Sequence, residues 1–106
     1  MKKLALIVRQ SLLLGLALAA APSWSSQQLA SDMGCYNCHS ASQRNGAPTM
    51  ARLAEQAGKL RGNDLAIKQA AEKLRAHALL HPIAVHERLG PEMAETLIRW
   101  LSEGAP

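Results

Sequence analysis

Two cysteines and a histidine stand together in the stretch Cys35-Tyr36-Asn37-Cys38-His39, and the chain has no other cysteine. Residues three apart on a helical turn project to nearly the same side, so the two thiols are expected to lie together. His39, one residue further on, points about 100° around such a turn. Two thiols at one edge and an imidazole beside them suit a flat macrocycle, which the thiols can attach while the imidazole binds its metal. This spacing is the C-x-x-C-H signature of haem attachment.

Three other interpretations of these residues remain open. A thioredoxin-like redox pair needs a βαβ context, which the sequence does not indicate. A disulfide between Cys35 and Cys38 closes a very short loop, so it would stabilise little and would leave His39 without a role. A zinc site could combine the two cysteines with His81 and His86, whose mutual spacing suits zinc. The 42 residues between Cys38 and His81 are an unusually long gap for such a site.

The first 26 residues have the pattern of a secretory signal peptide. Lys2, Lys3 and Arg9 precede an apolar run over residues 11–21, and small residues follow it. Eleven apolar residues are too few to span a bilayer as a helix. We therefore expect cleavage between residues 19 and 26, a periplasmic location, and a mature domain over residues 27–106 without a stable membrane span.

The charge of the mature domain is close to balanced. Residues 27–106 hold nine Lys and Arg against eight Asp and Glu, a net charge of +1, so the basic character of the whole chain comes mostly from the leader. Tyr36 and Trp100 are the only aromatic residues of this part, and they offer no stacking platform for bases. Neither feature favours nucleic-acid binding.

Hydrophobic periodicity predicts an all-α fold of about four helices and no strand. Turn-forming residues separate the helices, and residues 78–90 are expected to form an irregular loop. The expected helices cover residues 27–34, Met50 to Gly58 with Thr49 as N-cap, Asn63 as N-cap to about His77, and Pro91 to Gly104. The expected inner residues are Met50, Leu53, Ala54 and Ala57 on the second helix, Ile67, Ala70, Ala71 and Leu74 on the third, and Met93, Leu97, Trp100 and Leu101 on the last.

A mature domain of this size and composition needs additional bulk at its centre. About 80 residues give only marginal stability from an apolar core alone. The chain has no phenylalanine, and alanine and leucine dominate its apolar positions. Small exported domains of this kind are usually held by several disulfides or by a bound group. With one pair of cysteines available, a bound group is the stronger expectation.

The mature chain resembles the small class I bacterial c-type cytochromes over residues 27–106. The resemblance rests on "LASDMGCYNCH", "GAPTMARLA", "AAEKLRAH" and "AETLIRWLSEG". It implies one covalently bound haem c per chain, attached through Cys35 and Cys38 with iron bound by His39. It also implies that the carbonyl of Pro48 accepts a hydrogen bond from the ring of His39, and so orients it.

The second axial ligand departs from the pattern of that family. The family usually places a methionine in the loop before the last helix, and residues 78–90 contain none. His86 falls near the expected position, and neutral imidazole is a competent ligand for haem iron. His86 is therefore the preferred ligand and His81 the alternative. Five-coordinate iron remains open as well. We expect Met50 and Met93 to be core residues and His77 to be solvated.

These expectations favour a periplasmic electron carrier over an enzyme. No nucleophile, general base or substrate pocket is indicated, and the expected partners are other redox proteins in transient contact. Two alternatives remain open. One is a haem-based sensor or ligand-binding protein, and the other is the cytochrome subunit of a larger oxidoreductase.

Overall fold

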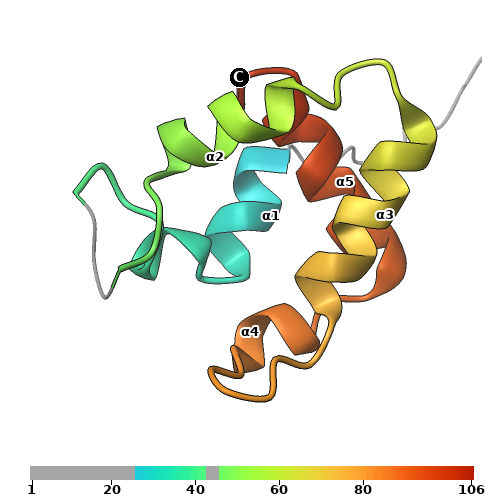
Figure 1. The fold of residues 1–106 in the computed structure, drawn as a ribbon. Helices are drawn as coiled ribbons and strands as arrows, with labels where there is room; N and C mark the ends of the chain where they lie inside the picture. The colour runs from blue at the N-terminus through green and yellow to red at the C-terminus, as the bar shows by residue number, and fades with distance from the viewer. Residues whose placement is uncertain (1–25, 43–45) are drawn as a thin grey trace, which may run out of the picture.

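The computed structural model describes residues 26–42 and 46–106, and within these ranges it contains helices and no strand. The predicted all-α fold is confirmed, and Figure 1 shows the helices arranged around a common centre. The predicted signal segment lies outside the described residues, except for Ser26, where the first helix begins. The elements are α1 (Ser26–Asp32), the 3₁₀ turn η1 (Cys35–Asn37), α2 (Met50–Gly58), α3 (Asp64–Arg75), α4 (Ala84–Glu87) and α5 (Pro91–Ser102).

Three helix starts follow the signals in the sequence. The Thr49 hydroxyl accepts a hydrogen bond from the backbone N–H of Arg52 at 3.2 Å, so Thr49 caps α2. Asn63 caps α3 in the same way through a 3.0 Å bond from the backbone N–H of Ala66. Pro91 occupies the first position of α5, where its missing N–H costs nothing. All three predicted starts are confirmed.

Two predictions about the segments between helices were wrong. The first helix ends at Asp32, and Gly34 then takes a left-handed conformation with φ 76°, so the cysteines lie on a separate 3₁₀ turn. Residues 78–90 are not wholly irregular, because Ala84–Glu87 form the short helix α4. A helix of a single turn is too short to show an amphipathic period in the sequence, so hydrophobic periodicity could not predict it.

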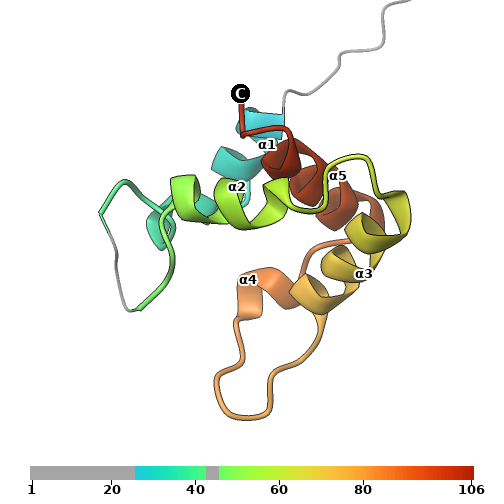
Figure 2. The same cartoon turned by 45° about the horizontal axis from the view of Figure 1, so that its top comes forward.

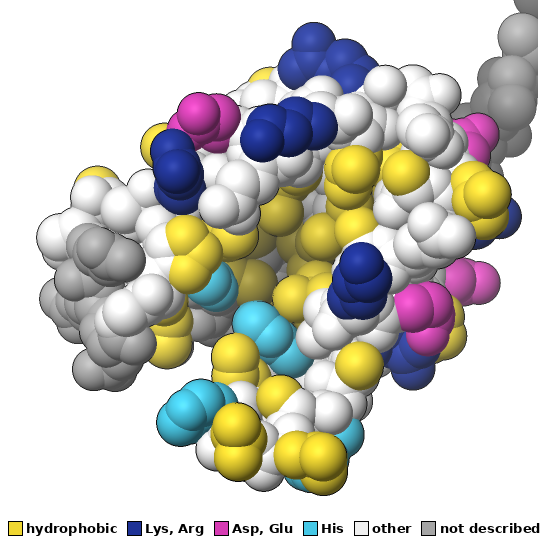
Figure 3. Space-filling view, in the orientation of Figure 1, with side chains coloured by type: hydrophobic (Ala, Val, Ile, Leu, Met, Phe, Trp, Pro, Cys, Tyr) yellow, Lys and Arg dark blue, Asp and Glu magenta, His cyan; other side chains and the backbone are white. Residues whose placement is uncertain are grey.

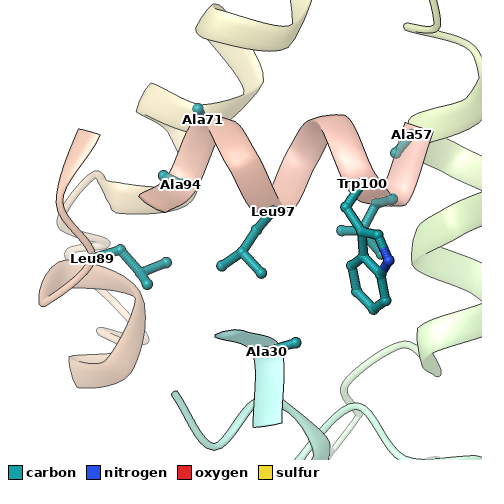
Figure 4. Packing of buried hydrophobic residues seen from close by; sticks show 8 residues of the cluster. Ala30, Ala57, Ala71, Leu89, Ala94, Leu97 and Trp100 are labelled. Atoms are coloured by element: carbon teal, nitrogen blue, oxygen red, sulfur yellow. The ribbon is translucent and has the colours of Figure 1, made fainter. Parts of the chain in front are cut away.

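Helix α5 packs against α1, α2 and α3, and so it forms the centre of the bundle (Figures 1 and 2). Ala71 of α3 and Ala94 of α5 are both buried, and their small side chains let these two helices approach closely. Figure 4 shows Leu89, Leu97 and Trp100 pointing into one space, with Ala30 of α1 across from them. The buried apolar residues are Ala30, Ala57, Ile67, Ala71, Leu89, Ala94, Leu97, Trp100 and Leu101.

The inner face of α5 differs from the predicted one at Met93. Its side chain is 38% exposed, whereas the neighbouring Ala94 is fully buried. The close contact between α3 and α5 at Ala71 and Ala94 turns residue 94 inward, and residue 93 lies about 100° away on the margin of the face. Leu97, Trp100 and Leu101 are buried as predicted.

The buried side chains are small for a helical domain. Four of the nine buried apolar residues are alanines, and the largest side chains with no appreciable exposure are Ile67 and Ser102. The core therefore contains few large side chains, which makes the contacts of each of them important.

Among the residues that the structure describes, no helix has the length and apolar character that crossing a membrane requires.

Replacing Ile67 with alanine is expected to lower the free energy of unfolding by about 2–4 kcal/mol, because it removes a buried branched side chain and leaves a cavity. Ile67 is 1% exposed. Leu65→Ala is the matched control, since Leu65 lies on the same helix and is 67% exposed. Its effect should stay near 0.5 kcal/mol or below, on the order of other surface changes. Denaturant titration of the two variants measures both values, and equal losses would contradict this burial pattern.

Candidate functional site: a histidine pair across an apolar hollow

The 3₁₀ turn η1 begins at Cys35 and ends just before Cys38. Side chains three residues apart eclipse one another on a 3₁₀ turn. The turn is closed by a bond from the backbone N–H of Cys38 to the carbonyl of Cys35 at 3.3 Å, and the N–H of His39 donates to the same carbonyl at 2.9 Å. Cys35 is half-buried against the core, whereas Cys38 is exposed, and both thiols are free. Burial raises the pKa of the Cys35 thiol.

A hydrogen bond to Pro48 orients the imidazole of His39. The ring nitrogen Nδ1 lies 2.7 Å from the carbonyl oxygen of Pro48. A carbonyl oxygen only accepts, so Nδ1 carries the proton in this bond. The other ring nitrogen, Nε2, is then left with its lone pair and is the atom able to bind a metal. The bond that the family resemblance implied is present, and it fixes both the tautomer and the orientation of the ring.

His86 of α4 faces His39 across a gap. The two ring centres are 6.2 Å apart, and the ring planes differ by 10°. Two imidazoles that bind one metal ion from opposite sides, each at a metal–nitrogen distance of about 2 Å, have ring centres about 6 Å apart. Burial lowers the pKa of His86, and the nearby charge of His39 lowers it further. A lowered pKa favours the neutral form of His86, which is the form that binds metals.

The space beside this histidine pair is an apolar hollow. Its cavity volume is about 50 Å³, and it opens to solvent. Figure 3 shows hydrophobic side chains at its floor and histidine at its edge. Its walls come from α1, η1, α2, α3, α4 and α5, so every element of the fold contributes to it. The lining residues are Ala30, Cys35, His39, Met50, Leu74, Val85, His86, Leu89, Leu97, Trp100 and Leu101.

The other candidate axial ligands occupy different places. His81 is exposed in the segment before α4, and it does not line the hollow. His77 is mostly exposed but is not simply solvated, because its Nδ1 bonds to the carboxylate of Glu87. Met93 lies on the margin of α5. Met50 does line the hollow, and it also packs against the core cluster as predicted.

The structure does not assemble the alternative zinc site. Within residues 26–42 and 46–106, no three side chains of histidine, cysteine, aspartate or glutamate come together as a metal site. The two cysteines and His86 therefore do not converge with His81. Instead, Cys35 and two imidazoles line an apolar hollow, with Cys38 three residues from Cys35, and this arrangement suits a planar metal-containing group better than a bare ion.

Two contacts around α4 had no sequence signal. Nε of Arg75 donates to the carbonyl oxygen of Leu89 at 2.8 Å, and His77 bonds to Glu87. The Arg75 contact uses a backbone carbonyl as acceptor, and every residue supplies one, so no residue type marks it. The contact between His77 and Glu87 joins residues ten apart across an irregular segment, where no helical or strand period relates them. Helix α4 was itself not predicted.

Comparisons with protein-family models, with curated proteins and with solved structures find no match for this chain.

Proposed function

We propose that this protein is a periplasmic electron carrier that holds one haem c covalently, with His39 and His86 as its two axial ligands. The observation that carries the proposal is the pair of parallel imidazoles 6.2 Å apart at the edge of an apolar hollow, with both cysteines on the adjoining turn. When bound, the haem supplies a one-electron couple between ferrous and ferric iron. An enzyme partner, where there is one, exchanges that electron in a transient contact.

Each side chain of the site has a separate task in this proposal. Cys35 and Cys38 form the two thioether bonds that keep the group on the chain when the fold opens. His39 holds the iron from one side, with its ring fixed by Pro48. His86 holds it from the other side, and its burial lowers its pKa, which favours the neutral form that binds metals.

The apolar lining supports electron transfer in preference to catalysis. Leu74, Leu89, Leu97 and Trp100 line the hollow and offer no acid, base or nucleophile to a substrate. An apolar wall also excludes water from the site. Because few water molecules then have to reorient when the charge of the site changes, the reorganisation that accompanies electron transfer is small. The bound group additionally provides the bulk that the small alanine-rich core lacks.

A redox titration followed by absorption tests the proposal. The protein is produced in the periplasm together with the haem-maturation machinery, and a His/Met-ligated cytochrome is titrated beside it. We expect one reversible one-electron transition at a lower potential than that of the reference, because a second imidazole favours ferric iron more than a thioether does. The proposal fails if the protein shows no reversible couple.

Addition of carbon monoxide to the reduced protein separates the carrier from a haem-based sensor. Two firmly bound imidazoles leave no open position, so the spectrum of a carrier should stay unchanged over minutes. A rapid and complete spectral change would instead favour a ligand-binding function. Co-purification of an intact oxidoreductase from the native periplasm would identify the protein as a subunit of that complex.

A further inference from the structure

The segment that carries His86 needs anchoring from elsewhere in the fold. Helix α4 has four residues, far fewer than a helix needs to be stable alone. Ile83, the N-cap residue before it, makes no side-chain capping hydrogen bond. Every residue of 76–84, the segment that leads into α4, is exposed. Burial of this segment therefore does not fix the position of His86, which depends on the buried Leu89 and on hydrogen bonds across the segment.

Arg75 connects the end of α3 to the backbone around His86. Its Nε donates to the carbonyl oxygen of Leu89 at 2.8 Å, and the N–H of Leu89 in turn donates to the carbonyl of His86 at 3.2 Å. Nη1 of the same guanidinium is 3.2 Å from both carboxylate oxygens of Glu72, one turn earlier on α3. Glu72 thus orients Arg75, whose side chain is 27% exposed and partly shielded from water.

His77, at the start of the exposed segment, provides a second anchor across it. Its Nδ1 bonds to the carboxylate of Glu87, the residue directly after His86. The two anchors start within three residues of each other at the end of α3, and they hold positions 87 and 89 of the segment beyond. The chain between them can move as a loop, while the backbone of His86 stays attached to α3.

We propose that Arg75 and His77 are positioning residues that keep His86 opposite His39. The inference rests on the proposed function, because it takes His86 to be the second axial ligand. Under this proposal, the two contacts determine the fraction of molecules in which His86 has dissociated from the iron. Since a competing small ligand binds only that open fraction, its apparent affinity measures the strength of the anchors.

Cyanide titration of the ferric holoprotein tests this inference. Arg75→Ala and His77→Ala should each raise the apparent affinity for cyanide roughly tenfold, as expected when one charge-assisted hydrogen bond that holds the closed state is lost. His77→Asn keeps an amide donor near the place of Nδ1, and its affinity should stay close to that of the unmodified protein. His77 is exposed, so its variants are not expected to impair folding.

Arg99→Ala is the matched control. Arg99 joins α3 to α5 through bonds to Asp64 and Glu95, away from α4. Its loss should loosen the bundle without changing the cyanide affinity. The inference is overturned if the Arg75 and His77 variants bind cyanide as the unmodified protein does, or if Arg99→Ala raises the affinity equally. Neither result would contradict the proposed function if the haem is low-spin in the unmodified protein and high-spin in His86→Ala. A chain without haem overturns the proposed function itself.

Discussion

Replacement of both Cys35 and Cys38 by alanine is expected to abolish covalent haem attachment completely. The thioether bonds are the only links in this account that survive denaturation, and the chain has no third cysteine to form one. The double variant should give no haem-dependent band on a denaturing gel, whereas the unmodified protein gives a strong one. Loss of the bound group should also leave the small core without its central contacts, and the variant should unfold at a much lower temperature.

Tyr36→Phe is the control for this pair of substitutions. Tyr36 lies between the cysteines on η1, and it is 37% exposed. The variant changes the same turn but keeps both thiols, so its haem should remain on the chain. Denaturation-resistant haem in the double cysteine variant would show that the group is attached elsewhere, and the assignment of Cys35 and Cys38 would then be wrong.

His86→Ala is expected to convert the iron from low-spin to high-spin. Removal of one of two strong-field imidazoles leaves five-coordinate iron or iron with a weakly bound water. The change should be complete at neutral pH, and electron paramagnetic resonance of the ferric protein with absorption spectroscopy measures it. The reduced variant should also bind carbon monoxide readily, because the position opposite His39 is then open.

Two further variants distinguish His86 from its competitors. His81→Ala should leave the spectrum unchanged, because His81 is exposed and does not line the hollow. Met50→Leu is the stricter control, since Met50 lines the hollow and carries a sulfur that could bind iron. If Met50→Leu yields high-spin iron while His86→Ala remains low-spin, the second ligand is Met50, and the facing histidines have another role.

The sequence predicted those parts of the fold that local chemistry determines. Thr49 and Asn63 are N-caps whose side-chain oxygens satisfy backbone donors within three residues, and Pro91 fixes its own backbone angle. The spacing of Cys35 and Cys38 likewise places both thiols on one turn, whichever kind of turn it is. These signals lie within a few residues of each other, and tertiary contacts do not change them.

The features that the sequence did not predict depend on contacts between distant elements. Met93 was expected inside, but the small Ala94 is buried where α5 lies against Ala71 of α3, and Met93 lies at the margin of the face. The bond from Arg75 to the carbonyl of Leu89 has no sequence signature, because every residue carries that acceptor. The family pattern did favour His86 over His81, but the helix α4, which carries the ring of His86 to 6.2 Å from that of His39, was not predicted.

The mass of the intact exported protein, measured under denaturing conditions after production with the haem-maturation machinery, tests the central claim most directly. The account predicts the mass of the mature chain plus one haem, with the haem absorption remaining on the chain after acid denaturation. The bare mass of the mature chain, with Cys35 and Cys38 free or joined as a disulfide, would contradict it.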